Sequence, residues 1–408
     1  MRMHVRPPTA TTTGTKDEEY PGRPLQITAF VRGTQTGDLL MEYDIHPNRF
    51  DPALISEPLR PVFARPLDVA QRTLEAILVA TNNTRLASEF DIGYTIEADF
   101  NACAYALDGR HIIDVSAATP ALLLALFFEV LGSTNPFSTS PDEPPVDDAH
   151  PGDFLFPQFL AAADQDDIHL ASTIDTVLRD AMPPEKWQRL MALALAELAT
   201  VFVFSHEIGH IVLGHTGILA DQRNLALMEL RSTRESVPGR VSRAWELAAD
   251  QSAFGMVWSY AVKNRRTRTR FLHYLRLESA SDPILELAGR LCYAISFVFF
   301  LLGQNLSEVD AQGSHPSTLV RVTFLIALAQ SILGEKHPSP GDRAYEVVTQ
   351  AHNFAEAAWN RLGLEFGKNS FSERIEDLPL AVTRSQRHMD QVRRRLGAYA
   401  WARPSTRR

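Results

Sequence analysis

The stretch that decides how this chain folds is FSHEIGHIVLGH, residues 204–215. His206 and His210 are four residues apart, so an α-helix would place both imidazoles on one face, one turn from each other. Two neutral histidines at this separation can share a zinc ion, and Glu207 between them can reach a water molecule beside that ion. The spacing therefore predicts a zinc site with a carboxylate placed for proton transfer.

An H-E-x-x-H string can also arise by chance on the surface of a helix. The residues just before this one argue against chance, because Leu190 to Phe204 is strongly apolar and predicts a buried helix. Titratable side chains are disfavoured in such a place unless they are paired or bind a metal.

A third protein ligand is needed to complete a catalytic zinc site. The metzincin spacing does not supply it, because Leu213 occupies the required glycine position and Thr216 the histidine position. His215 is one residue away from that position. On a continuous helix it would lie about 140° round from His210. We therefore expect His215 to point elsewhere and to serve packing or support.

The better third ligand lies downstream in RAWELAADQ, residues 243–251. Glu246 and Asp250 are one helical turn apart in an otherwise apolar, alanine-rich segment, and buried carboxylates need partners. Glu246 as zinc ligand and Asp250 as acceptor of a histidine N–H would satisfy both. The alanines would allow this helix to approach the motif helix closely.

An H-E-x-x-H motif followed by E-x-x-x-D resembles the gluzincin metallopeptidases of the CAAX prenyl protease and HtpX type. That family has an Asn-Ala-Phe-Ala-like strand before the motif, where this chain has NACA at 101–104, and a His-Pro segment with a later arginine, here His315 and Arg321. Lit-type and ImmA/IrrE-type peptidases are also similar at the motif, although the latter usually have Asn where this chain has Asp250. The chain departs from the first family at Cys103, which replaces an aromatic residue, and in lacking evident multiple membrane spans.

The resemblance implies a zinc-dependent endopeptidase with one zinc ion per chain and a protein or peptide substrate. Glu207 would act as general base, and His315 with Arg321 would stabilise the oxyanion. The implied roles are as follows: zinc ligands His206, His210 and Glu246; supporting residue Asp250; substrate-binding edge strand Asn101, Ala102, Cys103 and Ala104.

Three alternatives remain open at this point. The chain could be a signal-controlled regulatory or defence (phage-exclusion-like) protease module that acts mainly through a protein partner. It could be an inactive zinc-binding structural domain, although such a domain would have no need of Glu207. The Cys103 thiol could also occupy the open zinc position and keep the enzyme latent.

The composition is that of an ordinary globular protein: 408 residues with 45% hydrophobic and 22% charged residues. The net charge of −9 argues against a nucleic-acid partner, and we interpret the arginines after residue 383 as a solvated helix face. Two cysteines and a start without an apolar segment predict a cytoplasmic protein. The apolar stretch from Leu291 is short for a bilayer span, so we do not expect membrane association.

The pattern predicts an α+β fold that is mostly helical, with a zincin-like core, a small antiparallel or mixed sheet and the H-E-x-x-H helix. The expected strands are 25–31, 39–45, 94–100 and 111–115; the expected helices are 66–80, 120–130, 169–181, 184–215, 221–234, 239–262, 267–279, 283–304, 315–334, 341–362 and 379–400. We expect five parts: a disordered segment 1–24, an α/β part 25–131 with the edge strand, an acidic proline-rich loop or linker 132–167, a helical zinc-binding catalytic part 168–335, and a C-terminal helical part 336–408 with a basic tail.

Overall fold

A computed structural model describes most of the chain between residues 49 and 362. The described residues are 49–81, 90–97, 100–107, 110–133, 137, 167–217, 226–228, 239–303, 316–334, 341–362, 383, 387, 389 and 390. The expected disordered segment 1–24 and the expected strands 25–31 and 39–45 lie outside these residues. The same holds, apart from isolated positions, for the acidic loop and for the expected helix 379–400.

The H-E-x-x-H motif lies on the central helix of the fold, α5, which spans Lys186–Val212. Alanine and leucine dominate its first half and favour a helix, and two prolines directly before Glu185 suit its start. The helix ends at Val212 because Gly214 adopts a left-handed conformation with φ of 84°. Its C-terminal end therefore lies three residues before the predicted one, and its first residue lies two after the predicted start.

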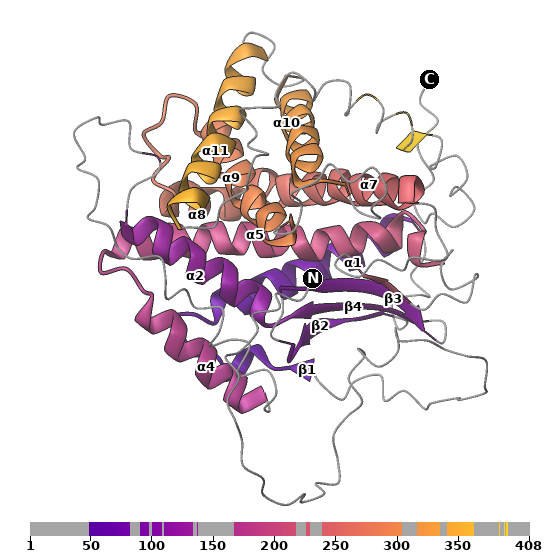
Figure 1. Ribbon diagram of the computed structural model, residues 1–408, viewed down its shortest axis with the longest axis horizontal. Helices are drawn as coiled ribbons and strands as arrows, with labels where there is room; N and C mark the ends of the chain where they lie inside the picture. The colour runs from indigo at the N-terminus through magenta and orange to yellow at the C-terminus, as the bar shows by residue number, and fades with distance from the viewer. Residues whose placement is uncertain are drawn as a thin grey trace, which may run out of the picture.

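Helix α5 runs between two layers of the protein (Figure 1). The sheet and the helices α1 (Pro61–Ala80) and α2 (Ala118–Ser133) pack on one side of it. The helices α7 (Gly239–Trp258) and α9 (Pro283–Gly303) pack against α5 from the other side. The motif is thus built into the middle of the core.

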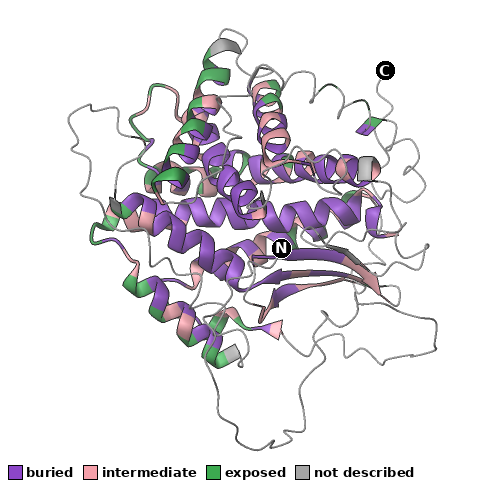
Figure 2. Cartoon of the chain, viewed as in Figure 1, coloured by how far each residue is buried: buried purple, intermediate pink, exposed green. Residues whose placement is uncertain are grey.

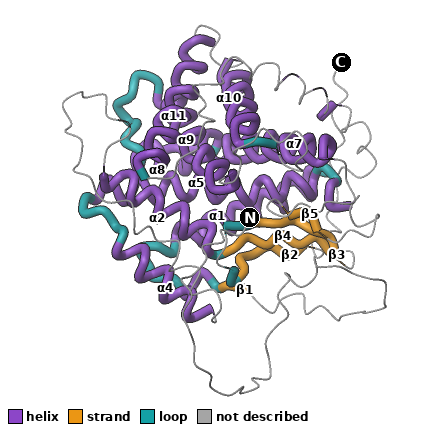
Figure 3. The backbone as a smooth tube through the Cα atoms, viewed as in Figure 1, coloured by secondary structure: helices purple, strands orange, loops and turns teal. Residues whose placement is uncertain are grey.

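The sheet has the strand order β1-β2-β4-β3-β5 (Figure 3). Its strands are β1 (Arg49–Phe50), β2 (Phe90–Thr95), β3 (Ala102–Leu107), β4 (Arg110–Ser116) and β5 (Ala226–Met228). The β2–β4 pair is parallel and the other three pairs are antiparallel, as expected for a small mixed sheet.

Strand β5 corrects two expectations. Residues 226–228 were predicted to be helical, but their backbone pairs with β3, and such pairing overrides a weak local preference. The same pairing joins Cys103 to Met228 and Tyr105 to Ala226, so β3 is not a free edge along those residues. A substrate backbone could add to β3 there only by replacing β5.

The remaining helices agree with the predicted pattern to within a few residues, except that the helix expected from 267 extends only from 265 to 274. They are α4 (Asp167–Asp180), α8 (Arg265–Tyr274), α10 (Thr318–Gly334) and α11 (Gly341–Arg361), with a 3₁₀ turn at Pro52–Leu54 and a π-helical turn at Ser259–Lys263. The fold class is therefore confirmed as α+β and mostly helical.

Burial is concentrated along α5 and the helices that cover it (Figure 2). By length and composition alone α5 and α9 could each cross a membrane, but 94% and 83% of their most apolar windows are buried inside the protein. Core helices of soluble proteins can have the same length and composition, so α5 and α9 are weak evidence for a membrane location.

Candidate metal centre

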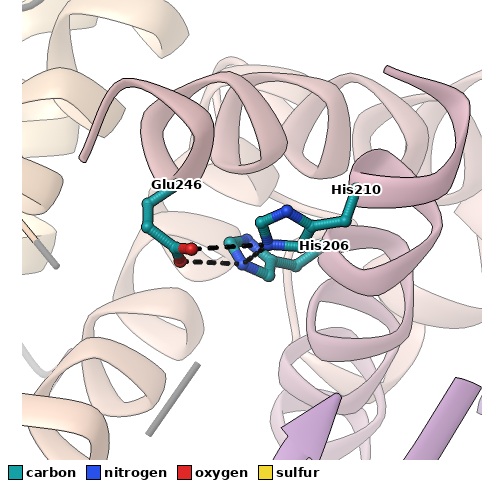
Figure 4. Close-up of side chains that lie close together, drawn as sticks. All are labelled: His206, His210 and Glu246. Atoms are coloured by element: carbon teal, nitrogen blue, oxygen red, sulfur yellow. Dashed lines mark hydrogen bonds and ion pairs between the residues drawn. The ribbon is translucent and has the colours of Figure 1, made fainter. Parts of the chain in front are cut away.

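Three side chains from two helices converge on one point (Figure 4). His206 and His210 come from α5 and Glu246 comes from α7. The Nε2 atoms of the two histidines are 3.0 Å apart. The Glu246 carboxylate lies 3.3 Å from His206 Nε2 and 3.7 Å from His210 Nε2. All three residues are at most 1% exposed.

This donor set fits a zinc ion. Ligands about 2.0–2.1 Å from zinc in a tetrahedron lie about 3.3 Å from one another. The observed separations of 3.0, 3.3 and 3.7 Å lie around that value. Two imidazoles and one carboxylate are also the protein ligands of open catalytic zinc sites, where the fourth position takes water or substrate. The three residues can therefore hold a zinc ion with little rearrangement.

The two ligand-bearing helices approach each other closely at Gly209. A β-carbon added to this glycine would lie 3.1 Å from the Cα and 3.2 Å from the backbone oxygen of Ala249. The glycine inside the motif and the small alanine of α7 thus allow the close contact that the alanine-rich segment predicted. The same two helices carry Glu246 and the two histidines.

Asp250 contacts the Nδ1 atom of His206, and Arg321 contacts Asp250 in turn. Its Nδ1 lies 2.9 Å from Asp250 Oδ1, and Arg321 donates to the same carboxylate from Nε at 2.9 Å and from Nη2 at 2.6 Å. Burial alone would raise the pKa of Asp250, but the Arg321 guanidinium and His206 outweigh it and lower that pKa. Asp250 therefore stays ionised, accepts the Nδ1–H of His206, and leaves the Nε2 lone pair facing the metal position.

Arg321 pairs with Asp250 in the structure, and its predicted oxyanion role stays a prediction. Both of its described carboxylate contacts go to Asp250, and its guanidinium lies 4.5 Å from the ring centre of Phe299. It is a bidentate partner of a buried carboxylate, a role that suits the planar guanidinium. This geometry does not support an oxyanion role for Arg321. His315, the other residue predicted for that role, lies outside the described residues.

His210 is held in turn by His215, contrary to our expectation that His215 points away. Gly214 adopts a left-handed conformation just after α5, and His215 Nδ1 lies 2.8 Å from His210 Nδ1. The expected direction was wrong because it assumed that the helix continues through residue 215, whereas the predicted packing or supporting role agrees with the contacts of His215. Burial lowers the pKa of His210 well below its ordinary value, aided by His206 and His215 and opposed by Glu246. The neutral form that a metal requires is thus favoured.

Glu207 and strand β3 are the other predicted site features that the structure describes. Glu207 is 1% exposed and follows His206 on α5, while β3 packs against the same helix. The backbone of Asn101 bonds within the protein, because its oxygen accepts from Ser116 N at 3.0 Å and from Thr119 Oγ1 at 3.1 Å. Cys103 is buried in β3 and does not belong to the group of side chains that converge within 4.8 Å.

Trp245 was missed by the sequence reasoning. Its indole stacks on His215 with the ring centres 4.9 Å apart and the planes 10° from parallel. The nearby sequence features, a tryptophan directly before a proposed ligand and a glycine where α5 ends, do not by themselves predict this stacking.

A comparison with protein families supports a peptidase. The sequence model of the family Peptidase U49 matches residues 175–352, a segment that contains all three converging side chains together with Asp250 and Arg321. The match supports a hydrolase that acts on proteins or peptides. Neither the curated proteins nor the solved structures gave a match.

Proposed function

We propose that this protein is a zinc-dependent endopeptidase with a zincin-like core of the gluzincin type and one zinc ion per chain. The observation that carries the proposal is the convergence of His206, His210 and Glu246, all buried and all within 4.8 Å of one another. The peptidase family match over the same segment supports the reaction class.

A bound zinc ion would polarise the scissile carbonyl and lower the pKa of the attacking water. Glu207, adjacent to His206 in the chain, would accept the proton of the attacking water as general base and later deliver it to the leaving amine. Asp250 and Arg321 hold His206 so that its Nε2 faces the metal. His315 remains our candidate for the oxyanion donor.

Two substitutions test the proposal. Glu207→Gln should abolish peptide hydrolysis and retain zinc, whereas Glu246→Ala should lose zinc. Zinc content would be measured by mass spectrometry and hydrolysis with a broad peptide library. Glu75→Gln, on the exposed face of α1, is the matched control and should behave like the wild-type protein. Full hydrolysis in either site variant would refute the assignment.

A second candidate is a peptidase that a signal switches on, with a regulatory or defence role through a protein partner. The burial of the site favours it, because the three ligands and Glu207 are each at most 1% exposed and a peptide needs access to them. Assays with and without cell extract separate the two candidates, since only a triggered enzyme would need the extract. An inactive structural zinc domain would stay inactive in both assays.

We further propose a protein or peptide substrate, a cytoplasmic location and no nucleic-acid partner. The net charge of −9 and the two cysteines, which are not joined in a disulfide, support these expectations.

A further inference from the structure

His215 makes two contacts that connect the ligand-bearing helices. Its Nδ1 lies 2.8 Å from Nδ1 of His210 on α5, and its ring stacks on Trp245, the residue before Glu246 on α7. His215 is 0% exposed and Trp245 3% exposed, so both contacts are inside the protein. A histidine outside the metal group thus touches one ligand and the neighbour of another.

We infer that His215 is a positioning residue: its Nδ1 accepts a hydrogen bond from His210 Nδ1–H and so fixes the tautomer and ring orientation in which His210 binds the metal. The inference rests on the proposed zinc site.

The geometry determines which nitrogen of each imidazole ring, His210 and His215, carries the proton. His210 turns its Nε2 toward His206 and Glu246, so this nitrogen must offer its lone pair to the metal. A neutral imidazole then carries its proton on Nδ1. That proton points at His215 Nδ1, which must accept it, and His215 therefore carries its own proton on Nε2. A doubly protonated His215 would oppose one N–H to another and break the bond.

Both ligand histidines then donate Nδ1–H to a hydrogen-bond acceptor, but the two acceptors differ in chemistry. His206 donates to the ionised carboxylate of Asp250, whereas His210 donates to a neutral ring. Hydrogen-bond partners of metal-binding histidines orient the ring, and their removal typically weakens metal binding about 10–100-fold. The same loss is expected when the His215 nitrogen is removed.

Two substitutions separate the hydrogen bond from the packing. His215→Phe retains a ring that can stack on Trp245 but has no acceptor, while His215→Asn offers an acceptor oxygen near the Nδ1 position and removes the stack. The measurement is the zinc dissociation constant of each refilled protein, obtained by competition with a chromogenic chelator. His273→Phe, at an exposed position on α8, is the control.

We expect His215→Phe to weaken zinc binding about 10–100-fold and His215→Asn to stay within about threefold of the wild type. Equal zinc affinity in the Phe variant and the wild type would overturn the inference, as would an Asn variant that loses as much affinity as the Phe variant. A wild-type protein that takes up no zinc would overturn the proposed function as well, so the two failures are distinguishable.

A second measurement uses only the wild-type protein, so it does not depend on whether a variant folds. The zinc-loaded wild-type protein, labelled with ¹⁵N at histidine, should show in two-bond ¹H–¹⁵N correlation spectra a buried ring next to His210 that is protonated on Nε2. Protonation of that ring on Nδ1 would contradict the inference.

Discussion

Gly209 of α5 and Ala249 of α7 lie so close together that a β-carbon on the glycine would be 3.1 Å from the Ala249 Cα. This close approach lies between the two helices that carry the proposed ligands. A second glycine, Gly255, lies on α7 with no atom within 4 Å of the position that its β-carbon would take. The pair allows a controlled test of how closely the helices must approach.

Gly209→Ala should push α7 away from α5, because the backbone of Ala249 cannot yield as a flexible side chain could. We expect a loss of about 1–3 kcal/mol in the free energy of unfolding and weaker zinc binding. Gly255→Ala should instead stabilise the protein by about 0.5–1 kcal/mol through its helix preference. Urea unfolding measures the free energy of unfolding of both variants, and zinc titration measures their zinc affinity. Equal values for the two variants would contradict the role of the Gly209–Ala249 contact.

Removing Arg321 should leave Asp250 as a buried charge without its bidentate partner. We expect Arg321→Met to cost about 3–5 kcal/mol in the metal-free protein. The double variant Arg321→Met/Asp250→Leu should lose less than the sum of the single losses, because no unpaired charge remains. Chemical denaturation measures all three variants. Additive losses would show that the two residues do not stabilise each other, and Arg72→Met, at an exposed ion pair on α1, should change little.

Glu197 is a buried carboxylate upstream of the motif on α5, and it contacts Arg65 at 3.2 Å, Arg270 and the Tyr260 hydroxyl. Glu197→Gln should cost about 1.5–3 kcal/mol because charge-assisted hydrogen bonds are lost. Zinc affinity should not change, because the residue lies more than two helical turns from His206. A large fall in zinc affinity would contradict this purely structural role. Glu57→Gln, 80% exposed, is the stability control.

His352 of α11 should make stability depend on pH. Burial lowers its pKa from 6.5 to about 3, and its Nδ1 lies 3.1 Å from Ser296 Oγ. At pH values between these two pKa values, His352 is protonated in the unfolded chain but neutral in the folded protein. The free energy of unfolding should therefore fall as the pH drops below 6.5, by up to about 1.4 kcal/mol per pH unit.

The measurement is urea unfolding of metal-free protein at several pH values between 7.5 and 4.5. His352→Leu should remove this part of the slope, whereas His273→Leu, at a side chain 61% exposed, should retain it. Equal slopes in the wild type and the His352→Leu protein would refute the prediction.

The sequence predicted the parts of this protein that depend on local spacing. Residues four apart on one helix, such as His206 and His210 or Glu246 and Asp250, do lie on one face in the structure. The pairing of β5 with β3 could not be read in this way, because it depends on contacts between residues more than a hundred positions apart. The partner of Arg321 was equally out of reach, since only the packing of α10 against α7 selects Asp250.

The left-handed turn at Gly214 makes one non-local contact visible in sequence. In H-E-x-x-H-x-x-x-G-H, the glycine ends the helix and the final histidine returns to the second histidine of the motif. This ten-residue string can serve as a search pattern that sorts H-E-x-x-H chains by how their second histidine is supported. Chains without the glycine should continue the helix and need another acceptor in its place.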